Sequence, residues 1–164
     1  MTESNPSISE RKKGLRQKML AMRRALSANE TESRGSSLKE NILSLPEYKN
    51  AKKIMAFLAM KGESNLDGFI RQALLDGKEV YIPVCLPERQ MEAGRLIDME
   101  HFEKGPLGLR NLPAGYEVTS PESLDLVLIP GLAVSQEGIR LGMGAGYYDR
   151  YLARVPFEKR VAAL

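Results

Sequence analysis

The sequence predicts an α/β protein with three layers, in which a largely parallel, Rossmann-like sheet has helices on both faces. Short apolar runs alternate with segments of helical periodicity from about residue 53 onwards, which is typical of βα units. The runs are continuously apolar, as in strands that are covered on both faces. A glycine-rich segment follows the apolar run 125–129. Ligands of such sheets bind beyond the carboxyl ends of the strands, where this segment falls.

The first 45 residues predict two helices. The first covers about 9–26, because apolar side chains recur on one stripe that we expect to face the core. The members of the stripe are Leu15, Met19, Met22 and Leu26. Residues 27–30 (SANE) have the form of a capping box, so a second helix begins there and runs to about Leu45, before Pro46. Gly35 weakens this second helix.

The rest of the chain alternates between strands and helices. We expect strands at 53–59, 79–84, 94–99, 125–129 and 160–164. We expect helices at 66–74, where Gly77 is a natural C′ residue, and at about 146–154. The glycines and prolines of 103–122 indicate an irregular crossing. The chain stops inside an apolar run, so we expect that C-terminal elements of the natural protein are missing.

Composition limits the possible functions. The 164 residues fit one domain, which we place at 1–164, and the net charge of +3 is too small to indicate a nucleic-acid partner by itself. No apolar run approaches the ~18 residues of a membrane span. A single cysteine excludes an internal disulfide and suits a reducing compartment. We therefore expect a cytoplasmic protein that binds neither membranes nor nucleic acids.

One histidine and one cysteine cannot assemble a zinc site of the Cys/His type. His101 lies in an acidic neighbourhood (DMEHFE) and is expected at the surface rather than in catalysis. Cys85 follows an apolar run, where we expect a buried and inert thiol.

The segment 140–149 (RLGMGAGYYD) predicts an anion-binding loop. Its glycines have no Cβ and adopt positive φ freely, so the backbone N–H groups can approach a ligand closely, and a helix N-terminus adds further donors. The alternative is a tight strand-to-helix turn whose glycines serve packing. Arg140 favours the ligand site, since a guanidinium can hold a phosphate.

Each of three further residues in this segment has two possible interpretations. The Asp149 carboxylate can bind Mg²⁺ or provide a favourable charge in the first turn of the helix. Tyr147 and Tyr148 can stack on a flat ligand or pack in the core.

The N-terminal helix is basic. Lys12, Arg16 and Arg23 fall within about 40° of one another beside the apolar stripe. At this border between core and solvent a cation can reach a bound phosphate. The alternative is a merely solvated face, and for Arg23 the two interpretations stay equally open.

Three blocks resemble the 5-formyltetrahydrofolate cyclo-ligases, also called methenyltetrahydrofolate synthetases. They are 12–16 (KKGLR) with 23–27 (RRALS), 57–60 (FLAM) with Glu63, and 130–133 (PGLA) with 138–149 (GIRLGMGAGYYD). Their order and spacing agree over nearly the whole chain, and the third block is the most specific.

The resemblance implies a reaction that depends on ATP and Mg²⁺. In it, 5-formyltetrahydrofolate becomes 5,10-methenyltetrahydrofolate with release of ADP and phosphate, through a phosphorylated formyl group that the folate N10 attacks. We expect a monomer. Two other hypotheses stay open: a non-catalytic relative that binds nucleotide or folate, and RNA binding through the basic N-terminal helix.

The resemblance also implies a role for each site residue. Arg140 and Tyr147 would be catalytic, and Asp149 would bind the metal. The ATP site would consist of Lys12, Arg16, Arg140, Leu141, Gly142, Met143, Gly144, Ala145, Gly146, Tyr147 and Tyr148. The folate site would consist of Arg16, Leu58, Glu63, Met143, Gly144, Ala145, Gly146 and Tyr147.

The chain departs from the family pattern at several positions. Met143 stands where the family often has Arg or another polar or aromatic residue, and Ala145 where it commonly has Gly or Lys. Loss of a cation there would weaken phosphate binding, and Ala145 requires a φ that suits a Cβ. Val134 and Ser135 replace the usual Phe-Asp. The family also continues past Leu164 with a segment that supplies a second acidic metal ligand.

Overall fold

The computed structural model describes residues 7–105 and 109–164 and contains a mixed, mostly parallel sheet of six strands. The order is β10-β7-β1-β2-β3-β6. The strands are β1 (Lys53–Met55), β2 (Glu79–Cys85), β3 (Met91–Leu96), β6 (Val118–Thr119), β7 (Leu126–Ile129) and β10 (Arg160–Ala162). Strands β10, β7, β1 and β2 are parallel, whereas β3 is antiparallel to β2 and β6. The connection 86–90 is too short for a parallel crossover, which explains the antiparallel part.

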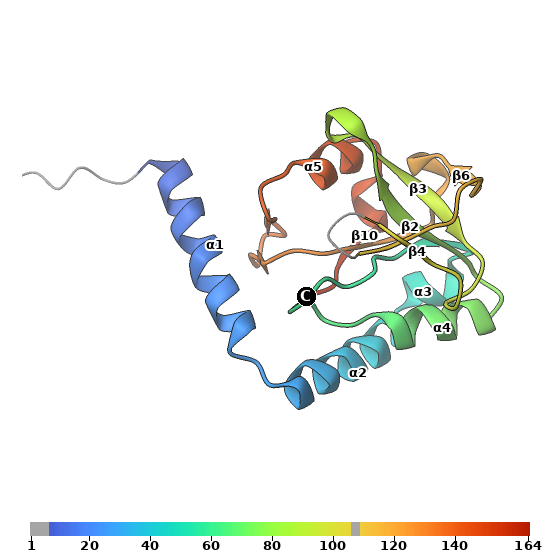
Figure 1. The fold of residues 1–164 in the computed structure, drawn as a ribbon, viewed down its shortest axis with the longest axis horizontal. Coiled ribbons are helices and arrows are strands. Elements are labelled where there is room, and N and C mark those ends of the chain that lie inside the picture. Colours follow the sequence, from blue (N-terminus) through green and yellow to red (C-terminus); the bar gives the residue numbers. More distant parts are fainter. Residues whose placement is uncertain (1–6, 106–108) are drawn as a thin grey trace, which may run out of the picture.

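Helices pack on both faces of this sheet (Figure 1). On one face lie α2 (Ala28–Ser44), α3 (Pro46–Asn50) and α4 (Asp67–Leu75), and on the other lies α5 (Tyr147–Leu152). Because side chains alternate along a strand, Ile54 of β1 joins the first cluster of core residues and Met55 joins the second. All four residues of β7 are buried, as expected for a strand that is covered on both faces.

We call the six-stranded sheet and the helices that cover it the body of the molecule. Helix α1 (Ile8–Arg24) lies beside this body and is not part of it (Figure 1). Both α1 and α2 begin with capping boxes, made by Ser7 with Glu10 and by the expected Ser27 with Glu30. No residue of α1 is buried, and Leu15 and Met22 are 43% and 57% exposed. The expectation that the whole apolar stripe faces the core is therefore wrong. None of the helices in 7–105 and 109–164 has the length and apolar character needed to cross a membrane.

Several element boundaries differ from the sequence prediction. Strand β1 ends at Met55 rather than at 59, and β3 begins at Met91 rather than at 94. The region 103–122 contains short paired segments, and the hairpin between residues 133 and 141 was not predicted. These segments are β4 (Glu103–Lys104), β5 (Arg110–Asn111), β8 (Ala133–Val134) and β9 (Arg140–Leu141), with 3₁₀ turns at Pro87–Arg89, Pro121–Ser123 and Phe157–Lys159.

Gly35 in the middle of α2 explains how this helix approaches the segment before α4. Gly35 is buried, and a Cβ at this position would stand 2.8 Å from the carbonyl oxygen of Asn65. Any larger residue would push that segment away. The glycine that weakens the helix is thus needed for close packing.

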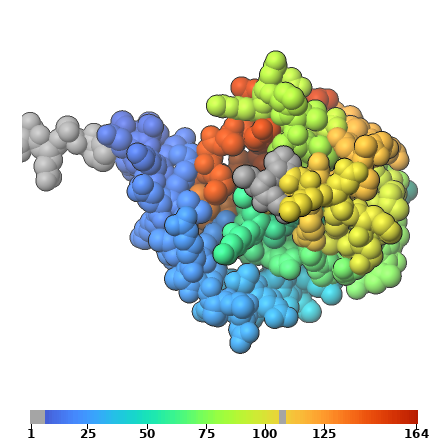
Figure 2. Space-filling model, in the orientation of Figure 1, coloured from blue at the N-terminus to red at the C-terminus, as the bar shows by residue number. Residues whose placement is uncertain are grey.

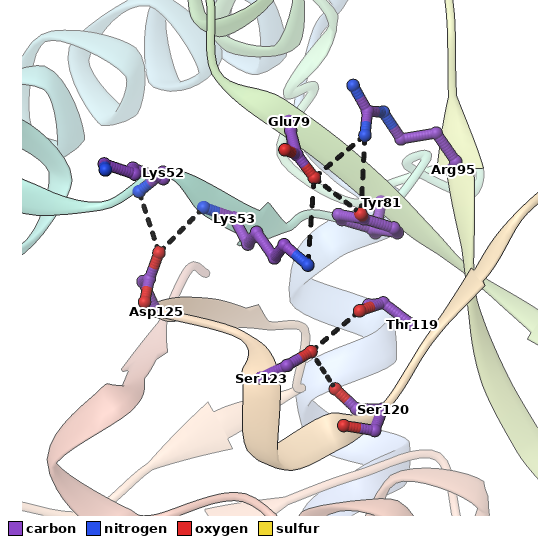
Figure 3. Close-up of polar contacts among 9 residues, drawn as sticks. All are labelled: Lys52, Lys53, Glu79, Tyr81, Arg95, Thr119, Ser120, Ser123 and Asp125. Carbon is purple, nitrogen blue, oxygen red and sulfur yellow. Dashed lines mark hydrogen bonds and ion pairs between the residues drawn. The ribbon is translucent and has the colours of Figure 1, made fainter.

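Polar contacts fix the amino ends of the parallel strands (Figure 3). The Asp125 carboxylate accepts hydrogen bonds from the backbone N–H groups of Lys52 and Lys53, at 2.8 and 2.9 Å. The Glu79 carboxylate accepts from the Tyr81 hydroxyl and pairs with Arg95, both at 2.8 Å. The first two contacts join the start of β1 to the residue before β7, and the contact with Arg95 joins β2 to β3. The carboxyl ends of the parallel strands, at the opposite side of the sheet, are left for the site.

Candidate functional site

A cavity of about 340 Å³ lies at the carboxyl ends of β1 and β7. From β1 the chain proceeds to β2 on one side, and from β7 it proceeds to β10 on the other. Ligands of α/β sheets bind where the strand order changes direction in this way. Phe57 and Leu58 follow β1, Pro130 and Gly131 follow β7, and all four line the cavity.

All residues that the sequence nominated for the site line this one cavity. They come from α1, from the segment after β1 and from the segment 140–149. The set is Lys12, Arg16, Leu58, Glu63, Arg140, Leu141, Gly142, Met143, Gly144, Ala145, Gly146, Tyr147, Tyr148 and Asp149. The structure places these residues together, and their individual roles stay predictions.

The cavity also has walls that the sequence did not indicate for the site. These are Phe57, Ala59, Met60, Ile82, Pro83, Cys85, Met91, Leu109, Arg110, Pro130 and Gly131. The positions directly after β1 and β7 could have been predicted, because ligands of α/β sheets bind beyond the carboxyl ends of the strands. Met91 and Arg110 come from elements whose pairing the sequence did not show, so no spacing pointed to them.

The glycine loop 142–146 has the backbone conformation that a close approach requires. Gly144 and Gly146 have φ of +101° and +83°, values that residues with a Cβ rarely adopt. Ala145 is not among the positive-φ residues, so its Cβ is compatible with the loop. Within the described residues, none of the N–H groups of 142–146 donates to another backbone oxygen. These donors are available to a ligand.

Arg140 connects the two ends of the glycine loop. Its guanidinium donates to the carbonyl oxygen of Pro130 at 3.0 Å and to the Asp149 carboxylate at 2.7 Å, and it lies over the Tyr148 ring. The Arg140 side chain is only 16% exposed, whereas that of Asp149 is 75% exposed. The arginine expected to hold a phosphate therefore also holds the two ends of the loop together.

Two cations of α1 line the cavity, and one of them contacts the loop. The Arg16 Nε donates to the carbonyl oxygen of Gly142 at 3.0 Å, and a Cβ on Gly144 would stand 3.5 Å from the Arg16 guanidinium carbon. Lys12 lines the same cavity one turn earlier in the helix. Figure 2 shows α1, in blue, against the orange segment that contains the loop. Free amides and cations thus face the same space, which makes this end of the cavity suitable for an anion.

Glu63 provides an acidic group on another wall. One of its carboxylate oxygens accepts a hydrogen bond from the Met60 N–H at 2.9 Å, and the other lies 3.9 Å from the Arg23 guanidinium. The Glu63 side chain is 14% exposed. A carboxylate that is fixed in this way can accept hydrogen bonds from N–H groups of a ligand.

The Tyr148 hydroxyl is buried and has no hydrogen-bond partner among the described residues. Burial raises the pKa of Tyr148 above its usual value, and the negative charge of Glu63 adds to the shift. The hydroxyl therefore stays protonated, and a group bound in the cavity could satisfy it.

Comparison with known proteins gives a consistent result. Residues 8–163 match the model of the 5-formyltetrahydrofolate cyclo-ligase family. The chain belongs to this family. A 5-formyltetrahydrofolate cyclo-ligase of Mus musculus is 32% identical over 90% of this chain and 76% of its own length. A probable one of Caenorhabditis elegans is 33% identical over 90% of this chain and 75% of its own.

A solved structure agrees with this assignment. The NMR structure of 5,10-methenyltetrahydrofolate synthetase from Aquifex aeolicus has a TM-score of 0.80 and 34% identity. It covers 93% of this chain, and this chain covers 76% of it. The cyclo-ligase resemblance that the sequence blocks carried is thus confirmed.

A divalent metal in this member of the cyclo-ligase family would have few protein ligands. Among the described residues, no group of three or more His, Cys, Asp or Glu side chains converges. The exposed Asp149 carboxylate borders the cavity and is paired with Arg140. Magnesium commonly takes one or two carboxylates and completes its shell with water and substrate phosphates. The residues therefore fit a magnesium ion that arrives with a nucleotide, not a cage built from protein alone.

The expected exposure of the single histidine is confirmed, whereas the expected burial of the single cysteine is not. The His101 side chain is 80% exposed, as expected, and pairs with Asp98. Cys85 was expected to be buried, but it is exposed at the end of β2 and lines the cavity. The expected burial is therefore wrong. Partial desolvation raises the pKa of the thiol, and its inertness stays a prediction.

Proposed function

We propose that the protein converts 5-formyltetrahydrofolate into 5,10-methenyltetrahydrofolate and consumes ATP in doing so. The observation that carries this proposal is the single cavity in which α1, the glycine loop and Glu63 meet. One end offers amides and cations to an anion, and another wall offers a carboxylate and apolar side chains to a heterocycle. We assign residues 1–164 to a single domain of this kind.

The proposed chemistry has two steps. The formyl oxygen attacks the γ-phosphorus of ATP, and ADP leaves. The folate N10 then attacks the activated formyl carbon, so a carbon–N10 bond forms, the carbon–oxygen bond breaks, phosphate leaves with the oxygen, and N10 loses its proton. Both steps depend on positioning and on neutralisation of phosphate charge, which requires no histidine.

The triphosphate would lie along the glycine loop. The unpaired N–H groups of 142–146 would donate to phosphate oxygens, and Lys12 and Arg16 would neutralise their charge from α1. Such donors are fixed before the reaction and need no reorganisation as charge develops. Arg140 and Tyr147 are the proposed catalytic residues, since both line the cavity beside the loop.

The folate would occupy the wall formed by the segment after β1. Leu58 would contact the ring, and the Glu63 carboxylate would accept hydrogen bonds from the pterin or the formyl-bearing region. Magnesium, when bound with the nucleotide at Asp149, would neutralise charge on the phosphates. A cytoplasmic location and a monomeric state stay predictions, and a relative from Arabidopsis thaliana is named as mitochondrial.

The test is a direct assay. Protein, MgATP and 5-formyltetrahydrofolate are mixed, the methenyl product is followed by its absorbance, and ADP is counted against it. One ADP per methenyl group is expected, and no product without ATP. Binding of both ligands without turnover would instead support a non-catalytic relative, which Met143 and Ala145 in the loop favour. A Met143→Arg variant that gains phosphate affinity but no turnover would further support the hypothesis of a non-catalytic relative.

A further inference from the structure

Arg23 connects three walls of the cavity. From α1 its guanidinium donates to the carbonyl oxygen of Gly131, in the turn after β7, and lies 3.9 Å from the Glu63 carboxylate, in the segment after β1. The Arg23 side chain is only 18% exposed. The sequence left open whether this residue is merely solvated, and these contacts decide against that interpretation.

The turn 60–63 lies beside Arg23. Gly62 has a φ of +85°, and a Cβ on it would stand 3.8 Å from the Arg23 Cβ. The same turn is closed by hydrogen bonds between Met60 and Glu63, at 2.9 Å in both directions. With Oε2 of Glu63 held by the Met60 N–H, the carboxylate presents Oε1 to Arg23. One oxygen of Glu63 is therefore held by its own turn, and the other is paired with a side chain from another element.

The turn after β7 is held by two arginines. The carbonyl of Pro130 accepts from Arg140, and the adjacent carbonyl of Gly131 accepts from Arg23. Arg140 belongs to the strand that leads into the glycine loop, and Arg23 belongs to α1. A movement of α1 would therefore displace both the turn after β7, which Arg140 connects to the glycine loop, and the contact with Glu63.

Helix α1 depends on such polar contacts. It has no buried residue, and its described hydrogen bonds to the body come from Arg16, which contacts the loop, and Arg23. A ligand phosphate that binds Lys12 and Arg16 would hold α1 in the position that the structure shows, and Arg23 with it, because the helix is rigid over the two turns between Arg16 and Arg23. The same event would stabilise the existing contact of the Arg23 guanidinium with Glu63.

We infer that Arg23 is a positioning residue that couples the nucleotide and folate subsites. Nucleotide binding on α1 favours the orientation of Glu63 that folate needs, and by reciprocity folate binding favours the nucleotide. Arg23 acts through Glu63 and Gly131 and does not touch the reacting atoms. This inference rests on the proposed function, because it takes Lys12 and Arg16 as nucleotide contacts and Glu63 as a folate contact.

The test measures binding of each ligand alone and in the presence of the other. Calorimetry with a non-hydrolysable ATP analogue and 5-formyltetrahydrofolate gives the factor by which one ligand raises the affinity for the other. We expect a factor of roughly ten for the unaltered protein and a factor close to one for Arg23→Gln. Arg23→Lys keeps the charge but not the two-pronged geometry, so its factor should lie between. Arg24→Gln, at the exposed neighbouring position outside the cavity, is the matched control and should keep the full factor.

A second variant protects the test against misfolding of Arg23→Gln. Glu63→Gln removes the other end of the contact, so it should also abolish the coupling, and the double variant should lose nothing further. A purely structural role of Arg23 would lower the affinity for each ligand alone and leave the coupling factor intact, which would overturn the inference. So would coupling that is absent from the unaltered protein although both ligands bind. If neither ligand binds to the unaltered protein, it is the proposed function that fails.

Discussion

Arg140 and Asp149 form an ion pair across the glycine loop, with 2.7 Å between Nη2 and Oδ1. The cation is largely buried and the anion is largely exposed. The pair joins strand β9 to the first turn of α5 and leaves the loop amides between its two partners. The residue proposed for phosphate and the residue proposed for metal are thus paired with each other in this structure.

Replacement of Arg140 by alanine should weaken nucleotide binding by about 1.5–3 kcal/mol, the range of a charge-assisted hydrogen bond. The variant loses the guanidinium at the cavity and the contact with the carbonyl of Pro130. Calorimetry with a non-hydrolysable ATP analogue measures the effect. Arg150→Ala is the control, since Arg150 donates a hydrogen bond to the backbone carbonyl oxygen of Glu88, outside the cavity. Equal affinities in the two variants would remove Arg140 from the site.

Asp149→Asn should separate metal binding from nucleotide binding. The variant loses a carboxylate ligand, so the magnesium concentration that gives half-maximal activity should rise several-fold. Metal-free ATP should bind more tightly, because a negative charge disappears from beside the phosphates and Arg140 loses its partner. Activity as a function of magnesium concentration and ATP binding in a chelator measure both effects. An unchanged magnesium requirement would exclude Asp149 as a ligand.

Gly144→Ala should strain the loop. At a φ of +101° the new side chain costs about 1–2 kcal/mol of folding free energy, and its Cβ would stand 3.5 Å from the Arg16 guanidinium. We expect a lower melting temperature and a lower affinity for the ATP analogue. Ala145→Gly is the matched control, because position 145 does not have positive φ. Equal behaviour of the two variants would show that the loop conformation does not matter for binding.

The pair of His101 and Asp98 should make a small contribution to stability that depends on pH. Hydrogen bonds from residues 100 and 101 lower the Asp98 pKa to about 2, and the bond with Asp98 raises the His101 pKa above its usual 6.5. The aspartate contribution is present above the ordinary aspartate pKa and disappears as pH falls through about 2. The histidine contribution is complete below pH 6.5 and disappears as pH rises through the raised pKa.

The measurement for this pair is thermal unfolding of the protein and of His101→Gln. The difference in melting temperature between them should be largest near about pH 6 and should shrink towards about pH 8. A difference that grows with pH would contradict the assignment.

The sequence predicted the parts of the fold that depend on local signals. The capping box at Ser27 and the continuous apolar run of β7 correctly marked an element start and a strand covered on both faces. The glycine loop was placed correctly because strand ends in a parallel sheet determine where ligands bind. The turn of β3 back along β2 was not predicted, because the expected third strand began three residues too late and hid the short connection.

Other features could not be predicted because distant residues determine them. Gly35 signals a weak helix locally, and only its contact with Asn65 shows why it is there. The exposure of Leu15 and Met22 depends on where α1 lies relative to the body, which periodicity does not specify. The contacts of Arg23 span more than a hundred residues of chain, so the sequence left its role undecided.

A helix without a buried side chain adds little to the cooperative unfolding of the rest of the molecule. Its amides should exchange with deuterium through openings of much lower free energy than those of the central strands, and ligand should slow them selectively. A preparation can therefore melt at the normal temperature although α1, which carries the cations of the site, is detached from the rest of the molecule. For this enzyme family member, saturation by ligand is a better criterion of a competent sample than heat resistance.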